Sequence, residues 1–342
     1  MCNPIWEGIQ DASKKELEEC ISRLMEQPLD ELMMQADKIR KKHYGNKVFF
    51  RGLVEFSNYC RHDCYYCGLR KSNQYLHRYR LSPDEILDSC LDGYNRGFHS
   101  FVLQSGEDMY YNGGRLIEVT AMIKEHLPNC ALTLSTGELD ASMYQKLYKA
   151  GADRFLLRHE SANPTHYEKL HPSPMTLESR KNCLYAIKES GMAAGAGFMV
   201  GSPGQTISHL ADDLLFLKQL QPRMIGIGPF IPQGQTPFAD KQPGTIKQTL
   251  IMLSLTRVLL PKAMLPATTA LGTLQRGGRE LALKSGANVV MPNVTSLKYR
   301  KDYMLYDGKI GTDDGIGEGL EQIKKSVLEI GYEPDFSKGD PV

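Results

Sequence analysis

The sequence predicts a parallel α/β fold, a closed (β/α)8 barrel of the TIM type with an N-terminal helical extension and a short C-terminal extension. Short apolar segments alternate with longer amphipathic ones from Val48 onward, which is typical of repeated βα units. Eight apolar segments with helical segments between them favour a closed barrel over an open, doubly wound sheet. Polar, glycine-rich stretches follow the apolar segments, at the end of a barrel where active sites lie.

The elements are expected in the following order. Ser13-Lys14-Lys15-Glu16 is a capping box that begins a helix through about Met25, and residues 29–42 repeat apolar side chains at helical spacing before Gly45. The barrel strands are expected at 48–56, 100–104, 131–135, 154–158, 193–200, 224–229, 264–266 and 287–291. The helices between them are expected at 83–97, 114–127, 141–150, 177–190, 207–220, 246–260 and 279–284.

The tail from Gly311 is rich in Asp, Gly and Lys, and one helix is expected near Leu320–Ile330. We therefore divide the chain into an N-terminal helical extension (1–46), a barrel (47–295) and a C-terminal extension that closes the barrel (296–342). Internal repeats and low-complexity segments do not occur in the sequence.

The composition predicts a globular cytoplasmic protein. Of the 342 residues 41% are hydrophobic and 24% charged, and the formal net charge is +1, so no overall field attracts nucleic acid or an anionic membrane. Residues 1–19 contain no basic segment followed by an apolar run, and nowhere in the sequence do about 18 uncharged apolar residues occur together. We therefore expect neither a nucleic-acid partner nor a membrane partner.

The cysteines predict a metal site. Three of the eight, Cys60, Cys64 and Cys67, fall within eight residues directly after the first expected strand, and none follows Cys183, unlike a secreted disulfide framework. Three thiolates so close can bind three irons of a cubane cluster and leave the fourth iron without a protein ligand. That open iron can chelate the amino and carboxylate groups of S-adenosylmethionine (SAM).

A structural zinc site is the alternative for the same cysteines. Such sites usually have four ligands, often as two CxxC pairs, and this sequence has no second pair, although His62 is available as a fourth ligand. The aromatic Tyr66 before the third cysteine and Gly68 after it favour the iron–sulfur cluster.

Other polar residues follow the later strands. In the stretch 104–108, Ser105, Gly106 and the Glu107 carboxylate are expected to hold an ammonium such as that of SAM, although alone this stretch is an ordinary turn. Glu160 and Arg180 are an opposite-charge pair that suits a zwitterion or ribose hydroxyls, or else a plain salt bridge. Glycines around Met199 allow a nucleobase or ribose to approach the backbone, or only form turns.

Together these residues resemble the HydE family of radical SAM maturases, which help to build the active site of FeFe-hydrogenase. The resemblance runs from about Arg51 to Lys309. It is carried by RGLVEFSNYCRHDCYYCGLR (51–70), VLQSGED (102–108), LLRHESAN (156–163), GFMVGSPGQT (197–206), MIGIGPFIP (224–232), PATTALG (266–272) and GANVVMPN (286–293). Such extended agreement is more specific than the cysteine triad, which biotin synthase and methylornithine synthase also have.

The resemblance implies an enzyme that uses one 4Fe-4S cluster to cleave SAM reductively to a 5′-deoxyadenosyl radical. The radical would act on a small sulfur-containing, organometallic iron–cysteine substrate during assembly of the H-cluster. Other hydrogenase maturases and an electron donor are the implied transient partners. By the same resemblance, SAM contacts Tyr66, Ser135, Glu160, Arg180 and Met199, beside the stretch at 105–107. The implied substrate positions are Thr133, Arg154, Arg158, Met224, Thr268, Thr269, Met291, Tyr303 and Tyr306.

The geometry of strands supports part of this set. Arg154 and Arg158 lie four residues apart on one expected strand, so both project to the same side, where two guanidinium groups facing the lumen attract cyanide ligands or a carboxylate. If they face the helices, they need carboxylate partners instead. Thr268 and Thr269 are adjacent, so both face the lumen only if they lie on the loop past the strand. Tyr303 and Tyr306 are expected on one face of a short helix, where packing is the commoner explanation for such a pair.

The sequence departs from the HydE pattern in one respect, and two other functions remain possible. Several HydE-like proteins carry a second cluster on cysteines near the C-terminus, and since this sequence has none there, we expect a single cluster. The same feature counts against biotin synthase, which needs a second cluster. An amino-acid mutase like methylornithine synthase is the alternative enzyme, and a non-catalytic zinc or cluster scaffold is the alternative outside enzymes.

Overall fold

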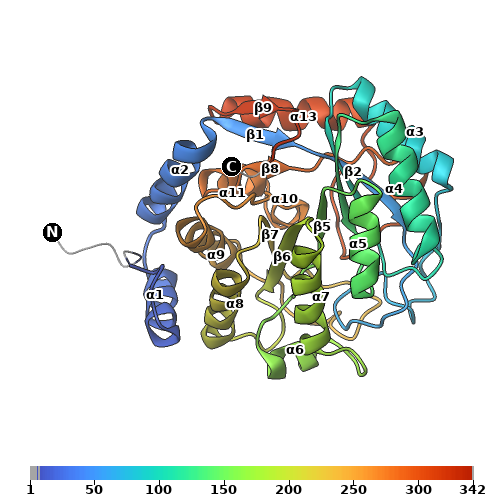
Figure 1. Ribbon diagram of the computed structural model, residues 1–342. Coiled ribbons are helices and arrows are strands. Elements are labelled where there is room, and N and C mark those ends of the chain that lie inside the picture. Colours follow the sequence, from blue (N-terminus) through green and yellow to red (C-terminus); the bar gives the residue numbers. More distant parts are fainter. Residues whose placement is uncertain (1–5, 7, 341–342) are drawn as a thin grey trace.

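The computed structural model describes residues 6 and 8–340, so the ends of both predicted extensions, 1–5, 7 and 341–342, lie outside the described residues. Parallel strands form the centre of the molecule and helices surround them (Figure 1). The strands are β1 (Lys47–Phe50), β2 (Gly52–Ser57), β3 (Ser100–Ser105), β4 (Ala131–Ser135), β5 (Arg154–Leu156), β6 (Ala193–Val200), β7 (Met224–Pro229), β8 (Val289–Val290) and β9 (Glu333–Asp335).

The barrel closes through single bridges between its two sheets. Strands β2 to β7 follow each other in order in a parallel sheet, and β1 pairs in parallel with both β8 and β9. Parallel bridges continue the ring from Met224 to Met264 and from Pro266 to Val289. A further parallel bridge joins Leu53 of β2 to Asn293, just past β8. The predicted (β/α)8 barrel is therefore confirmed.

The helices form in the segments that the apolar spacing predicts, and capping residues fix where several begin. Ser13 and Ser82 each form a capping box, with Glu16 and Glu85 respectively, and Pro83 occupies the first turn of α3. The longer helices are α1 (Lys14–Glu26), α2 (Asp30–Tyr44), α3 (Pro83–Asn95), α4 (Gly114–His126), α5 (Ala141–Lys149), α7 (Leu177–Glu189), α8 (Ile207–Leu220), α9 (Ile246–Leu259) and α13 (Ile316–Glu329). The shorter ones are α6 (Pro164–Leu170), α10 (Thr269–Leu274), α11 (Gly278–Lys284) and α12 (Leu297–Arg300).

The structure differs from the sequence prediction in a few elements. The expected first strand is two strands, β1 and β2, because the chain breaks its pairing at Arg51 and changes partners from β8 to β3. The expected strand at 264–266 makes only isolated bridges. The short helices α6, α10 and α12 and the strand β9 were not predicted, since each is too brief to show a period in the sequence.

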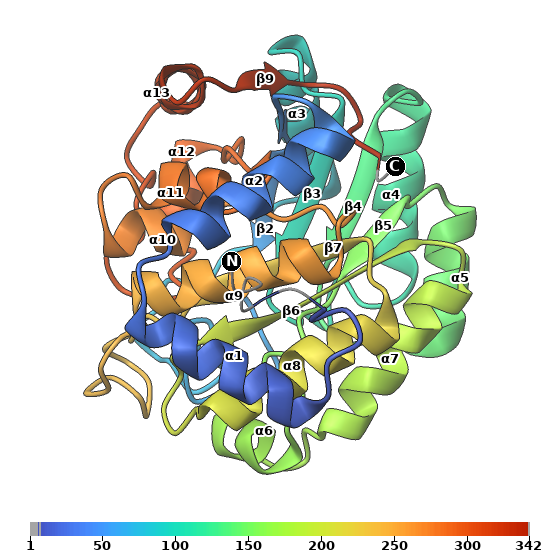
Figure 2. The same cartoon turned by 90° about the vertical axis from the view of Figure 1, so that its left-hand side faces the viewer.

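The N-terminal extension packs against the outside of the barrel. Helix α1 lies across α8, and α2 lies across α9 (Figure 2). In the C-terminal segment, α13 leads into β9, which pairs in parallel with β1 (Figure 1). The division of the chain at residues 46 and 295 stays a prediction. Among the described residues, no helix has the length and apolar character needed to cross a membrane.

Candidate functional site

The cysteine motif lies on the loop that follows β2, and the rest of the protein fixes this loop. Backbone hydrogen bonds run from Tyr65 N to Leu170 O at 3.0 Å and from Gly68 N to Leu305 O at 2.9 Å. A Cβ at Gly68 would come within 2.0 Å of the Met304 carbonyl oxygen, so only glycine fits there. The glycine after the third cysteine therefore allows close contact between the loop and the C-terminal segment.

Cys60, Cys64 and Cys67 are unpaired, partly exposed thiols. Burial raises the pKa of all three, that of Cys67 to about 12, and neighbouring cysteines of the motif raise the pKa values of Cys64 and Cys67 further. Thiols in such surroundings become thiolates when a metal supplies positive charge. Within residues 6 and 8–340, no three His, Cys, Asp or Glu side chains converge on a single ion. A cubane, by contrast, binds each thiolate at a different iron.

The stretch after β3 packs against this loop. A Cβ at Gly106 would come within 2.2 Å of the Tyr59 carbonyl oxygen. The Glu107 carboxylate is 5% exposed and pairs with Arg61, with His62 Nε2 at 3.0 Å and with Glu138 N at 2.9 Å. Although burial raises the pKa of Glu107, these partners lower it overall.

Ser105 lines the cavity that runs into the barrel from this loop, but Glu107 does not. We expected the Glu107 carboxylate to hold an ammonium, but it already pairs with Arg61 and His62 of the cysteine loop. This carboxylate holds the loop in place instead.

A cavity of about 530 Å³ runs from the cysteine loop into the barrel lumen. Most of the predicted site residues line it. They are Tyr66, Cys67, Ser105, Ser135, Arg158, Glu160, Arg180, Met199, Thr268, Thr269, Met291 and Tyr306. Thr268 is the N-cap of α10 and Thr269 is its first residue. Both therefore lie past the strand at 264–266, which is the condition under which the sequence allowed both to face the cavity.

Buried polar atoms without a hydrogen bond face this cavity. Within the part of the chain that the structure describes, Arg158 Nε, Glu160 Oε2 and Thr268 Oγ1 are buried and form none. Glu160 has a left-handed backbone with φ of 62°, which is uncommon outside glycine and asparagine. Unsatisfied donors and acceptors at a cavity wall fit a polar ligand such as SAM and its co-substrate.

The charged pairs differ from those predicted. Arg180 Nε donates to Glu138 Oε1 at 2.6 Å, and Arg180 Nη1 donates to the Arg158 carbonyl oxygen at 2.7 Å. Glu160 Oε2 instead lies 3.1 Å from Arg158 Nη2. The predicted Glu160–Arg180 pair is therefore wrong, because Arg180 pairs with Glu138, just past β4, and Glu160 pairs with Arg158. Both arginines and Glu160 still line the cavity.

Four of the other predicted residues lie away from the cavity. Arg154 donates to Ser100 Oγ at 3.0 Å, to Lys338 O at 2.8 Å and to Asp340 at 2.5 Å, so it lies where the C-terminal tail covers the barrel. Thr133 pairs in register with Arg154, and Met224 Sδ accepts from Arg51. Thr133, Arg154 and Met224 therefore do not line the cavity.

Tyr303 is 1% exposed within the hydrophobic core. Because α12 ends at Arg300, Tyr303 and Tyr306 lie on an irregular segment, and the expected helix face is wrong.

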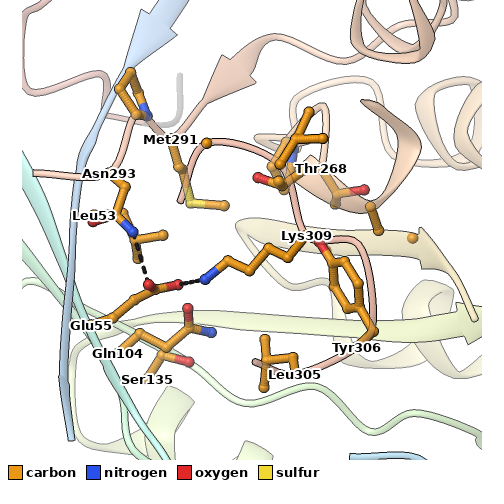
Figure 3. A pocket seen from close by; sticks show the side chains of 18 of the residues that line it. Leu53, Glu55, Gln104, Ser135, Thr268, Met291, Asn293, Leu305, Tyr306 and Lys309 are labelled. Carbon is orange, nitrogen blue, oxygen red and sulfur yellow. Dashed lines mark hydrogen bonds and ion pairs between the residues drawn. The ribbon is translucent and has the colours of Figure 1, made fainter. Parts of the chain in front are cut away.

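The sequence prediction missed a polar group on the cavity wall. Glu55 of β2 accepts from Lys309 Nζ at 2.5 Å and from Asn293 Nδ2 at 2.8 Å, and all three residues line the cavity (Figure 3). Glu55 had a detectable signal, since it is the sole acidic residue in the apolar stretch 48–56. Lys309 had none.

Comparisons with known proteins agree with this geometry. The radical SAM superfamily model matches residues 54–217. The FeFe hydrogenase maturase subunit HydE of Thermotoga maritima is 48% identical over 89% of this chain and 86% of its own length. The 3-methylornithine synthase of Methanosarcina acetivorans is 30% identical over 96% of this chain and 92% of its own length.

Solved structures share the fold. The crystal structure of methylornithine synthase (PylB) has a TM-score of 0.82 and 26% identity, with 97% of each chain covered. The maturase HydG from Carboxydothermus hydrogenoformans has a TM-score of 0.74 at 20% identity, covering 97% of this chain and 82% of its own, and shows the fold alone. Membership of the radical SAM superfamily implies a 4Fe-4S cluster and SAM, which the free thiols and the polar cavity fit. The chain is thus a radical SAM enzyme and belongs to the HydE family of FeFe-hydrogenase maturases.

Proposed function

We propose that this chain cleaves SAM reductively and directs the product radical at a small sulfur-containing iron–cysteine complex during assembly of the H-cluster. The cavity carries the proposal, since it connects Cys67 with polar residues deep in the lumen, such as Thr268. The 48% identity to a HydE maturase over most of both chains supports the context. When bound, the cluster supplies the electron that converts SAM to a 5′-deoxyadenosyl radical.

The residues of the chain divide into three groups in this proposal. Cys60, Cys64 and Cys67 hold the cluster. Tyr66, Ser105, Ser135, Glu160, Arg180 and Met199 surround SAM at the end of the cavity near the cysteine loop, where Glu160 Oε2 accepts no hydrogen bond and lies 3.1 Å from Arg158 Nη2. Arg158, Thr268, Thr269, Met291 and Tyr306 face the co-substrate, and Arg158 Nε and Thr268 Oγ1 are free to donate to an anionic ligand such as cyanide.

The C-terminal segment excludes water from the reaction. Residues 305–323 line the cavity at many positions, among them Tyr306, Lys309 and Ile323. Gly68 N donates to Leu305 O, which fastens this segment to the cysteine loop. A closed site protects a reactive radical from solvent, so we propose that residues 296–342 act as the cover of the barrel.

We further propose a single cluster, because no cysteine follows Cys183 in the sequence. A cytoplasmic location, where other maturases and an electron donor act, suits a protein whose seven described cysteines are all free thiols.

Activation of inactive FeFe-hydrogenase tests the function. The anaerobically reconstituted chain, SAM, a reductant and the iron product of the partner maturase are added to a hydrogenase that lacks its di-iron subcluster. Hydrogen evolution that depends on the chain and is lost in Cys64→Ala supports the proposal. Activation that proceeds equally without the chain would rule it out.

Methylornithine synthase activity is the second candidate, favoured by the TM-score of 0.82 and by 30% identity to a curated 3-methylornithine synthase. Lysine incubated with the chain, SAM and reductant distinguishes the two. Isomerised lysine would favour the mutase, and unchanged lysine together with hydrogenase activation would favour the maturase.

A further inference from the structure

The Glu55–Lys309 pair on the cavity wall carries an inference beyond the cluster and SAM. Glu55 is 1% exposed and the Lys309 side chain 8% exposed, and their charged atoms lie 2.5 Å apart. Glu55 comes from a barrel strand, whereas Lys309 comes from the C-terminal segment (Figure 3). The pair therefore joins, at the cavity wall, two parts of the chain that lie 254 residues apart.

Such a pair is poorly explained by stability. Removing two charges from water costs several kcal/mol, and apolar replacements of buried ion pairs are often neutral or stabilising. Charged side chains in the wall of a ligand cavity can instead fix the orientation of a bound ligand. Neighbouring residues keep both charges in place: Asn293 Nδ2 donates to Glu55 Oε2 at 2.8 Å, and Lys309 Nζ also donates to the Tyr303 carbonyl oxygen at 3.0 Å.

The strand register places a further polar side chain beside this pair. Gln104 of β3 is the register partner of Glu55, and both line the cavity. The Gln104 amide points toward the Glu55 carboxylate in Figure 3. An amide that carries both donors and an acceptor can bind either end of a zwitterion.

The charges limit which ligand can bind here. An anion alone would pair with Lys309 but meet the Glu55 carboxylate, and a cation alone would meet the Lys309 ammonium. A ligand with adjacent ammonium and carboxylate groups can separate the pair and give each residue a new partner, so no buried charge is left unpaired.

We propose that Glu55 and Lys309, with Gln104 beside them, form the subsite for the amino-acid end of the substrate. Glu55 accepts from its α-ammonium group, and Lys309 donates to its α-carboxylate. The inference rests on the proposed function, since it names the residues that bind the amino-acid part of that substrate. SAM lies beside this subsite, toward Cys67, because Ser135 of the SAM group is the register partner of Gln104.

Calorimetric binding to the reconstituted holoenzyme with SAM tests the subsite. The probes are S-methyl-L-cysteine, its N-acetyl derivative, which lacks the ammonium, and its methyl ester, which lacks the carboxylate. The wild-type protein is expected to bind S-methyl-L-cysteine about tenfold or more tightly than either derivative. Equal affinity for the three, or no binding of S-methyl-L-cysteine, would overturn the inference without any variant.

Two variants assign the charges. Glu55→Gln should remove the preference over the N-acetyl derivative, and Lys309→Met should remove the preference over the ester. Lys301→Met is the matched control, because Lys301 pairs with Asp313 on the surface of the same segment. Should Lys309 only fasten the C-terminal segment, Lys309→Met would lower the melting temperature and leave both preferences intact, which contradicts the subsite.

SAM cleavage by the same wild-type preparation keeps the two proposals separate. Absent cleavage with iron bound would refute the proposed function. Normal cleavage with no discrimination among the probes would refute only the subsite.

Discussion

Arg180 Nε and Glu138 Oε1 lie 2.6 Å apart, and this pair fixes a guanidinium group at the wall of the cavity. Both side chains are largely buried, with 9% and 15% exposure. The Arg158 carbonyl oxygen binds a second nitrogen of Arg180, so the guanidinium has little freedom to turn. Glu138 therefore positions Arg180, and the Glu160 carboxylate pairs with Arg158 instead.

Glu138→Gln is expected to weaken SAM binding about tenfold, because the charge-assisted hydrogen bond that orients Arg180 is lost. Equilibrium binding of SAM to the reconstituted protein measures the effect. Glu178→Gln, on the first turn of α7 beside Arg180 in the sequence, is the control and should bind SAM like the wild type. Unchanged SAM affinity in Glu138→Gln would show that Arg180 needs no such support.

Asp213→Ala is expected to destabilise the protein by roughly 2 kcal/mol, because it leaves the buried Ala162 N–H without its acceptor. Asp213 Oδ1 lies 3.3 Å from His159 Nε2 and accepts from Ala162 N at 2.6 Å, so it holds the turn that carries Glu160. Urea unfolding under anaerobic conditions measures the change.

Asp212→Ala is the matched control for that variant. Asp212 pairs with Lys14 nearer the surface, and its loss should cost about 1 kcal/mol or less. Equal effects of the two substitutions would contradict the structural role of Asp213.

Acid should destabilise the protein through His166. This ring is buried between Ser161 and Ser202 and stacks on His209, and burial, followed by the His209 charge, lowers its pKa to about 4. The unfolded chain, with a pKa near 6.5, binds the proton more tightly, so the stability from a neutral His166 is complete above about pH 6.5 and decreases toward pH 4.

The contribution of His166 is measured as the difference between the wild type and His166→Asn. From pH 7.5 to pH 5 the wild type should lose about 2 kcal/mol more than the variant, which has no proton to bind there. Parallel loss in both proteins would show that other groups cause the acid sensitivity.

The barrel was predictable because its strands and helices each repeat a clear period. The cysteine motif was predictable because its three cysteines lie close together in the sequence. Gly68 and Gly106 have definite reasons in the structure, since a Cβ at either would strike a backbone oxygen. Sequence spacing therefore sufficed for the fold and for one end of the site.

The rest of the site depends on contacts between distant residues. Arg154 and Arg158 were expected to act together, but they lie at different depths, and the tail near Asp340 already binds Arg154. Glu55 and Lys309 meet only because residues after β8 return across the barrel. No spacing rule in one sequence gives the depth of a side chain in the lumen or the path of an irregular segment.

The most direct test is the fate of SAM with the reduced protein. Anaerobically reconstituted wild-type chain, with SAM and dithionite, should contain about four irons and release 5′-deoxyadenosine and methionine in equal amounts. Cys64→Ala should release neither, whereas Cys20→Ala, which removes a buried thiol of α1, should behave like the wild type. Intact SAM beside a fully loaded and reduced wild-type protein, or zinc in place of iron on the three cysteines, would contradict the radical SAM chemistry.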